Sequence, residues 1–371
     1  MDVFFNVCKI KYDILDEYIG KSISRNNIHS CNLFINLDYI NYRFRNVQSN
    51  TRFQACGASA FKQYASNVLN LVAHYKKWFN RNGLSVKCYI YYTDAAGGFT
   101  SALIKRGYRE DYLIKQDMNN PDCYYVNNAT TAGIQLLKTM CDYIDGVYMI
   151  NTKGEEPSVV PYLVAMNKPA DWNYLLSMDR LELQYCNYDK FSILYPSIKF
   201  GSKVVNSSEL WEIIGAKENL FRPHLTQYDP RLFIPAMAIA GDRTRSIKKV
   251  KALGWGAIFD ALEEIYNMDS EHSIITSLEH MEELLSTKNK ATTEKYLYTY
   301  RMNTLVISMK SRYDVMSESN KAMILAQIRD IPDKETVNQI ANNPMILGNY
   351  PINVDALFGA STNRVDWSKK Y

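Results

Sequence analysis

Short apolar runs, most of them followed by an acidic residue, are the feature that most constrains this chain of 371 residues. Runs of this length predict buried strands, and the stretches between them carry apolar residues at helical spacing. Strands that alternate with helices predict a mainly parallel sheet covered by helices on both faces. The predicted strands are Leu33–Leu37, Val86–Tyr92, Val147–Ile150, Asn173–Ser177 and Phe191–Tyr195.

Carboxylates follow four of these runs, namely Asp38, Asp94, Glu156 and Asp179. The carboxyl ends of parallel strands meet at one edge of a sheet, and open α/β sheets bind their ligands there. Carboxylate oxygens are the ligands that Mg²⁺ and Mn²⁺ prefer. The sequence therefore predicts a shared acidic cleft. For any one of these acids, capping of the next turn is the alternative.

A basic stretch interrupts the second half of the chain. An apolar run that begins at Ile234 stops at Gly241 and Asp242, and apolar periodicity resumes at Trp255 after Gly254. We interpret the stretch as helix, turn, helix, with a turn that offers backbone amides and a basic rim to a phosphodiester backbone. A solvated basic loop between two helices is the alternative. The cations of the turn are Arg243, Arg245, Lys248, Lys249 and Lys251.

These patterns together resemble the 5′-nucleases, the family of flap endonucleases and phage 5′–3′ exonucleases. Asp38, Asn41 and Arg43 match the family's first-strand motif, roughly D-G-x-N followed by an arginine, except that its glycine is a tyrosine here. Asp179 and Gln184 match a later motif, roughly G-D-x-D-L-x-Q. Around the basic turn the family has roughly G-D-x-x-D-N-I-P-G-V-x-G-I-G, which is matched at Gly241, Asp242, Ile247, Val250, Leu253 and Gly254.

The resemblance spans about residues 33–265 and implies a PIN-like fold with a helix–three-turn–helix DNA-binding subdomain. It implies that the four strand-end acids bind Mg²⁺ or Mn²⁺, and that Asp242 joins them as a catalytic residue. The implied partner is DNA at single-strand/duplex junctions. The implied DNA-binding residues are Arg43, Arg106, Arg109, the five cations of the turn and Gly254.

Arg106 and Arg109 lie in a segment that resembles the start of the family's arch over single-stranded DNA. Cations and tyrosines there can bind a strand by charge and stacking. A solvated amphipathic helix fits the same residues equally well.

Four positions depart from the family's acids. The resemblance places aspartates where this chain has Ser158, Val159, Leu181 and Arg245. A leucine cannot bind a metal, and a guanidinium about 4 Å from a divalent ion repels it by roughly 8 kcal/mol at an effective dielectric of about 20. We therefore expect one metal site, with the second absent or displaced, and Arg245 could bind phosphate instead. Glu155, Glu182 or Asp171 could replace the missing aspartates only if their side chains point into the acidic cleft.

Two functions remain open at this point. One is a divergent 5′-nuclease that cuts branched, flapped or nicked DNA with impaired metal-dependent hydrolysis. The other is a catalytically inactive pseudo-nuclease, a DNA-binding or assembly protein of viral type. The predicted division of the chain is an extension that packs on the core or docks a protein partner (1–32), the α/β domain (33–205), the helix–three-turn–helix region (206–290) and a segment that packs back on the core (291–371).

Composition narrows the class of protein further. The hydrophobic fraction of 47% and the charged fraction of 22% are those of a globular protein, and the net charge of +4 is only mildly basic. Seven dispersed cysteines without a C-x-x-C pair predict reduced thiols, and with them a cytoplasmic location, which for a viral protein is the host cytoplasm. We expect no membrane span, since no apolar run approaches about 18 residues.

Overall fold

The computed structural model describes most of the chain. The described residues are 9–20, 23, 27–37, 40, 58–93, 121–197, 202–217, 229–242, 247–251, 253–268, 278–347 and 350–359. Within them, only the backbone is described at 58–60, 121–130, 216–217, 263–268 and 278–280.

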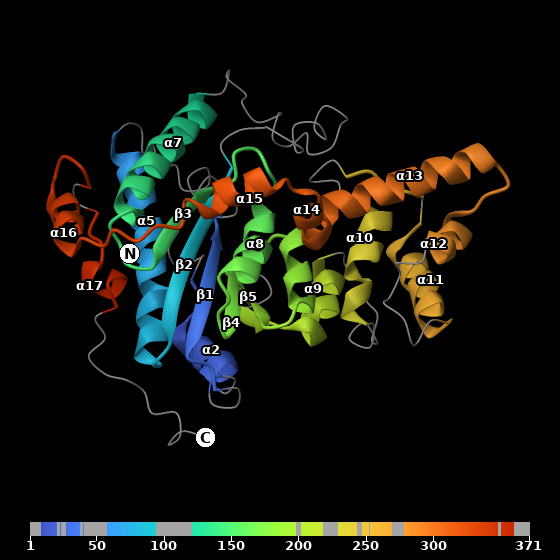
Figure 1. The fold of residues 1–371 in the computed structure, drawn as a ribbon, viewed down its shortest axis with the longest axis horizontal. Helices are drawn as coiled ribbons and strands as arrows, with labels where there is room; N and C mark the ends of the chain where they lie inside the picture. Colours follow the sequence, from blue (N-terminus) through green and yellow to red (C-terminus); the bar gives the residue numbers. More distant parts are fainter. Residues whose placement is uncertain are drawn as a thin grey trace.

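A six-stranded sheet forms the centre of the protein, in the order β3-β2-β1-β4-β5-β6 (Figure 1). All neighbouring pairs among β1 to β5 are parallel, and β6 is antiparallel to β5 at one edge. This confirms the mainly parallel α/β fold expected from the sequence. The strands are β1 (Ser30–Asn36), β2 (Ser85–Tyr92), β3 (Val147–Asn151), β4 (Trp172–Leu176), β5 (Phe191–Tyr195) and β6 (Lys203–Val205).

The strand boundaries follow the apolar runs closely. β5 coincides with the predicted strand, and β2 begins one residue earlier than predicted. β1 begins at Ser30, so its first residues lie inside the stretch assigned to an N-terminal extension. β6 was not among the predicted strands, because three residues at an antiparallel edge carry too little periodicity to be recognised.

Side chains alternate between two hydrophobic cores, one on each face of the sheet, because successive residues of a strand point to opposite faces. On β1, Phe34 belongs to the core shared with α8 and α9, whereas Leu33 and Ile35 belong to the core shared with α5 and α7. Every strand is therefore covered on both sides, which explains the nearly continuous apolar runs. These helices are α5 (Ala58–Arg81), α7 (Pro121–Cys141), α8 (Val160–Asn167) and α9 (Leu210–Lys217).

The N-terminal segment packs on α5. It carries the short helix α2 (Tyr12–Leu15) and the π-helical turn η1 (Asp16–Gly20), whose apolar residues Leu15 and Ile19 are buried in the same core as α5. His74 on α5 hydrogen-bonds the carbonyl of Ile10 at 2.8 Å. Leu15 and Ile19 are thus part of the core, whereas Tyr18 is exposed, and a protein partner for this segment stays a prediction.

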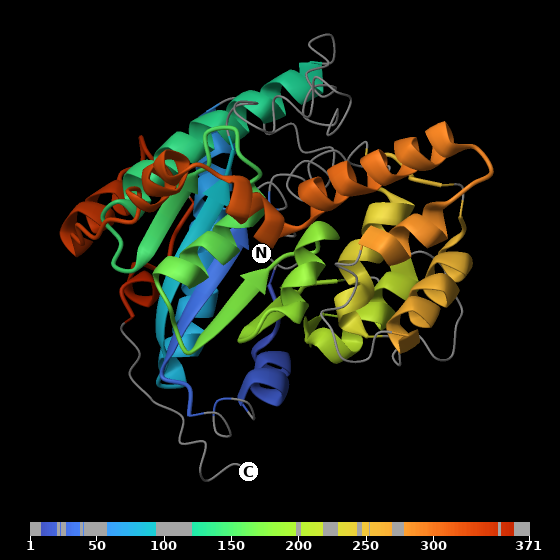
Figure 2. The ribbon, with the colours of Figure 1, turned by 45° about the vertical axis from the view of Figure 1, so that its right-hand side comes forward.

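A helical lobe lies to one side of the sheet, drawn in yellow and orange in Figure 2. Its long helix α13 leads from the lobe back to the sheet, where Gln184 forms hydrogen bonds with the backbone at the end of the helix. The amide nitrogen of Gln184 donates to the carbonyl of Ile307 at 2.8 Å, and its oxygen accepts from the amide of Met309 at 2.9 Å. The helices are α10 (Phe233–Ala240), α11 (Trp255–Met268), α12 (Leu278–Leu285), α13 (Lys290–Ile307) and α14 (Met309–Val315).

The C-terminal helices return across the sheet domain. Gln327, just after α15, exchanges hydrogen bonds with the backbone of Asn151 at the end of β3, and α17 packs on α5. In Figure 1 this part of the chain, drawn in red, reaches the outer side of α5 and α7. The helices are α15 (Glu318–Leu325), α16 (Lys334–Asn342) and α17 (Val354–Leu357).

None of the helices in the described ranges is both long and apolar enough to cross a membrane.

Candidate functional site

The carboxyl ends of the parallel strands are in register at one edge of the sheet. Asn36 at the end of β1 pairs with Tyr91 on β2, and Tyr92 pairs with Asn151 at the end of β3. On the other side of β1, Ile35 pairs with Leu176, the last residue of β4. The strand order reverses direction between β1 and β4, and at such a switch point the loops that follow the strands diverge and leave room for a ligand. We call the side of the sheet where β1 to β4 end the carboxyl edge.

Several predicted site residues lie outside the described residues. They are Asp38, Asp94, Arg43, Arg106, Arg109, Arg243 and Arg245. Asp38 follows the end of β1 by two residues, and Asp94 follows the end of β2 by two residues. Since these two strands are hydrogen-bonded neighbours, both acids follow adjacent strands at the same edge. The roles expected of all seven residues stay predictions.

Glu156 lies at the carboxyl edge, just before the 3₁₀ turn η3 (Pro157–Val159), and is 1% exposed. Its side chain does not cap that turn. The loop that carries it is tied to β2 by a hydrogen bond of 2.9 Å from the amide of Gly154 to Oγ1 of Thr93. Beside it, Oε1 of Glu155 accepts from the side-chain amide of Asn320 on α15 at 3.0 Å.

Asp179 lies in the turn between β4 and the 3₁₀ helix η4 (Leu181–Asn187). Its Oδ1 accepts from the amide of Leu181 at 2.8 Å, and its own amide donates to Oγ of Ser177 at 2.9 Å. One carboxylate oxygen therefore caps the turn that follows β4, which was the alternative to metal binding for an acid at a strand end. Asp179 is partly exposed, unlike the fully buried acids around it.

Glu182 points inward from η4 and is fully buried. Its Oε1 accepts two hydrogen bonds of 2.7 Å, one from Nδ2 of Asn36 and one from the hydroxyl of Tyr91. Burial raises the pKa of the carboxyl, while donors on Ser177, Tyr91, Ser158 and Asn36 oppose the rise. Spacing alone did not show this orientation, because a short 3₁₀ segment has too few residues to reveal which face is buried.

Three of the four positions where the resemblance implies further aspartates are buried, and the fourth, Arg245, lies outside the described residues. Val159 and Leu181 are 0% exposed and belong to one hydrophobic cluster, and Ser158 is 1% exposed. Apolar side chains packed in this way offer no oxygen to a cation. Asp171, considered as a replacement, lies at the opposite edge of the sheet, where it accepts from the amides of His29 and Ser30.

The residues that the structure describes do not make a divalent-cation site by themselves, and the number of metal sites stays a prediction. Within those ranges no three His, Cys, Asp or Glu side chains gather in a way that could hold a metal ion. Glu156, Asp179 and Asp242 therefore do not form a metal site by themselves. A single cation at this edge depends on Asp38 and Asp94, and it remains a prediction.

Arg312 is a charged residue that the sequence analysis did not single out. It lies on α14, is 2% exposed, and its helix packs against η3, next to Glu156. A guanidinium stays protonated even when buried, so it brings a fixed positive charge to this side of the sheet. No periodicity could have identified it, since it is distant in sequence from every strand-end acid.

The basic turn begins where α10 ends. Gly241 has φ +68°, and a Cβ there would clash with the carbonyl groups of Ile247 and Lys248. Asp242, 2% exposed, pairs with Ile247 through two backbone hydrogen bonds of 2.9 Å. The glycine is therefore needed for both its backbone conformation and the close approach of the returning chain.

A buried amide fixes the returning strand of this turn. Nδ2 of Asn303, on α13, donates to the carbonyl of Lys248 and to the carbonyl of Ala238, both at 2.7 Å. Val250 adds a backbone hydrogen bond of 3.0 Å to Ile239. These contacts hold the turn against α10 and α13 with the side chains of Lys248 and Lys249 exposed.

The glycine at the end of the turn differs from the first one. Gly254 is exposed, and a Cβ placed on it would meet nothing within 4 Å. Its carbonyl accepts from the amide of Ile258 at the start of α11. Lys251, two residues before Leu253, is half-buried. The described part of the turn thus lies between two helices, as the sequence predicted, with Lys248 and Lys249 exposed and Lys251 partly covered.

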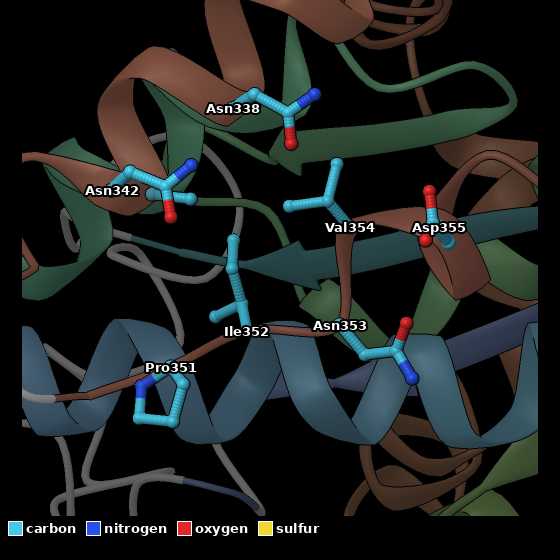
Figure 3. A pocket seen from close by; sticks show the side chains of 8 residues that line it. Asn338, Asn342, Pro351, Ile352, Asn353, Val354 and Asp355 are labelled. Atoms are coloured by element: carbon cyan, nitrogen blue, oxygen red, sulfur yellow. The ribbon is translucent and has the colours of Figure 1, made fainter.

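A cavity of about 650 Å³ lies elsewhere, between α16 and α17 on the outer side of α5 (Figure 3). Asn338, Asn342, Asn353 and Asp355 contribute its polar side chains. Its lining carries amides and a carboxylate but no cation, so it does not suit a phosphate group. We do not assign it to the site at the carboxyl edge.

No protein-family model and no curated protein sequence matches the chain. Among solved structures it is similar to the bacteriophage T5 D15 flap endonuclease in a pseudo-enzyme–product complex with DNA and metal ions, with a TM-score of 0.53, 14% identity, and coverage of 80% of this chain and 98% of that one. The bacteriophage T5 5′-exonuclease with zinc ions gives a TM-score of 0.53 at 14% identity, covering 81% and 100%. The chain therefore has the fold of the 5′-nucleases.

Proposed function

We propose that this chain is a divergent 5′-nuclease-family protein that binds DNA through the basic turn between α10 and α11. The observation that carries the proposal is the way the described part of the turn is held by hydrogen bonds. Gly241 closes it, Asn303 holds it, and Lys248 and Lys249 remain exposed on it. Fixed backbone and exposed lysines suit the regular phosphates of a DNA strand and do not read its sequence.

The proposed substrate is branched, flapped or nicked DNA. The structurally similar T5 flap endonuclease is described in complex with product DNA and metal ions, which supports this choice for a chain of the same fold. The turn and the carboxyl edge are connected by α13. The end of this helix forms hydrogen bonds with Gln184, which lies in η4 shortly after Asp179 in the sequence. α13 therefore connects the proposed DNA-binding turn to the segment that follows Asp179.

Hydrolysis is the second candidate function, supported by Glu156 and Asp179 at the edge where Asp38 and Asp94 are expected. Cleavage by two metals requires carboxylates that hold both cations roughly 3.5–4 Å apart. Val159 and Leu181 replace two of the expected acids with buried apolar side chains. The geometry therefore favours DNA binding with impaired or absent cleavage. If cleavage occurs, we propose a single Mg²⁺ or Mn²⁺.

The test uses a labelled 5′-flap duplex, a nicked duplex and a plain duplex. Binding is measured by fluorescence anisotropy in EDTA, and cleavage is measured separately in Mg²⁺ and in Mn²⁺ with wild type and Asp179→Ala. Binding of flapped or nicked DNA in EDTA without cleavage supports the pseudo-nuclease. Cleavage that Asp179→Ala abolishes supports the enzyme. Absence of binding to all three DNAs would overturn the proposal.

A further inference from the structure

The carboxyl group of Glu182 joins segments that are far apart in the sequence. Its Oε1 accepts from Asn36, the last residue of β1, and from Tyr91 on β2, both at 2.7 Å. Glu182 itself belongs to η4, which follows the turn that carries Asp179. One buried oxygen thus links the ends of two neighbouring strands to the segment that follows a third.

We propose that Glu182 is the positioning residue of the carboxyl edge: its carboxyl clamps the Asp179 turn to the ends of β1 and β2 without the help of a metal ion. This inference concerns the assembly of the edge and does not depend on whether the chain binds DNA. It assigns a role to an acid that the family pattern does not include at this position.

The surroundings of Glu182 explain why a carboxyl can do this work. The neighbouring Leu181 and Leu183 are 0% exposed and belong to the core, so the group lies in a medium of low dielectric. A hydrogen bond is stronger there than in water, and a buried partner that loses it cannot turn to solvent. Asn36 and Tyr91, 2% and 0% exposed, are such partners.

The second oxygen of the carboxyl is buried as well, and Oε2 makes no hydrogen bond within the described residues. Burial raises the pKa of Glu182, while donors on Ser177, Tyr91, Ser158 and Asn36 oppose the rise. The contacts of the carboxyl with the two strand ends therefore both run through Oε1, which accepts from Asn36 and Tyr91.

The same position explains why a second cation is not needed to assemble the edge. A divalent ion holds separate loops together by binding their carboxylates at once. Here Asn36, Tyr91 and Glu182 make the equivalent connection with hydrogen bonds. The Asp179 turn is further fixed by Ser177, whose hydroxyl accepts from the amide of Asp179 at 2.9 Å. We therefore expect the edge to be assembled in the metal-free protein as well.

The experiment is backbone amide exchange of residues 177–187, followed by mass spectrometry, in EDTA and in Mg²⁺. Three proteins are compared: wild type, Glu182→Gln and Glu182→Leu. Glutamine keeps an oxygen for Asn36 and Tyr91 and mimics the neutral acid. Leucine has a similar volume but offers no acceptor. We expect exchange in this segment about tenfold faster in Glu182→Leu, within about threefold of wild type in Glu182→Gln, and unchanged by EDTA in wild type.

Two results would overturn the proposal. Faster exchange of wild type in EDTA would show that a metal clamps the edge. Equal effects of Gln and Leu would show that the acceptor oxygen is not what matters. If Glu182→Leu does not fold, Tyr91→Phe removes one donor and keeps the ring. Its matched control is Tyr89→Phe on the same strand, because the hydroxyl of Tyr89 has no hydrogen-bond partner among the described residues. Faster exchange in Tyr91→Phe alone supports the clamp, and equal exchange in both overturns it.

Discussion

Asn303 donates a hydrogen bond of 2.7 Å to the backbone carbonyl of Lys248, and the same amide nitrogen donates to Ala238. The side chain is 0% exposed, so both carbonyls depend on it. This contact makes α13 the support of the basic turn. The geometry of the proposed DNA-binding surface is thus determined partly by a helix that the sequence places more than fifty residues further on.

Asn303→Leu should reduce both stability and DNA affinity. Two buried carbonyls lose their donor, and each unsatisfied group costs about 1–3 kcal/mol, so we expect unfolding to become easier by about 2 kcal/mol or more. DNA affinity should fall severalfold at a temperature where the variant remains folded, since the lysines lose their fixed positions. Urea unfolding and anisotropy measure the two effects. The control is Gln339→Leu, an exposed amide on α16, and equal effects of the two changes would contradict the role of Asn303.

The two glycines of the turn should respond differently to alanine. Gly241→Ala introduces a side chain at φ +68° against the carbonyls of Ile247 and Lys248, so a loss of about 2 kcal/mol or more is expected. Gly254→Ala places a methyl group in open space and should change stability by less than about 1 kcal/mol. Denaturant unfolding of both variants measures the difference. A Gly254→Ala variant as unstable as Gly241→Ala would show that the turn is built differently.

How far the sequence predicts this structure differs from one element to another. β5 coincides with its predicted strand and the other parallel strands lie within three residues of theirs, because buried parallel strands leave long apolar runs. The antiparallel β6 was missed, since it spans only three residues. The apolar run was predicted to stop at Gly241, and α10 does end there, with Gly241 at positive φ.

The candidate site was less accessible to sequence reasoning. Glu182 was considered only as one of three acids that could point inward, and the structure shows that it does, whereas Asp171 lies at the opposite edge. Asn303 and Arg312 were not recognised at all. All of these depend on which way a side chain points after distant segments have packed, and neither spacing nor composition contains that information.

Acidification should loosen the N-terminal segment through His74. Burial, with smaller contributions from Lys9 and Lys77, lowers the pKa of this histidine from 6.5 to about 4, against the opposing effect of the hydrogen bond to Ile10. The unfolded chain therefore binds a proton that the folded protein resists, so stability is full above about pH 6.5 and falls as the pH decreases toward 4. The hydrogen bond to the carbonyl of Ile10 requires a protonated Nε2, which the neutral ring can supply.

Unfolding measured between pH 7 and pH 4.5 tests this. Over this range the free energy of unfolding of wild type should fall by up to about 3 kcal/mol more than that of His74→Gln, because each unit of pKa shift corresponds to roughly 1.4 kcal/mol. Glutamine keeps an amide donor for Ile10 and does not titrate. Parallel pH profiles of the two proteins would mean that His74 does not carry the pH dependence.

The most direct test of the central claim is the salt dependence of DNA binding. Dissociation constants for a 5′-flap duplex are measured between 50 and 300 mM KCl in EDTA, for wild type and for the variant Lys248→Ala/Lys249→Ala/Lys251→Ala. Each phosphate contact contributes roughly 0.9 to the slope of log K against log salt, so the variant should have a slope smaller by about 2 to 3 and a lower affinity for every DNA tested. An unchanged slope would show that the turn does not contact the phosphate backbone.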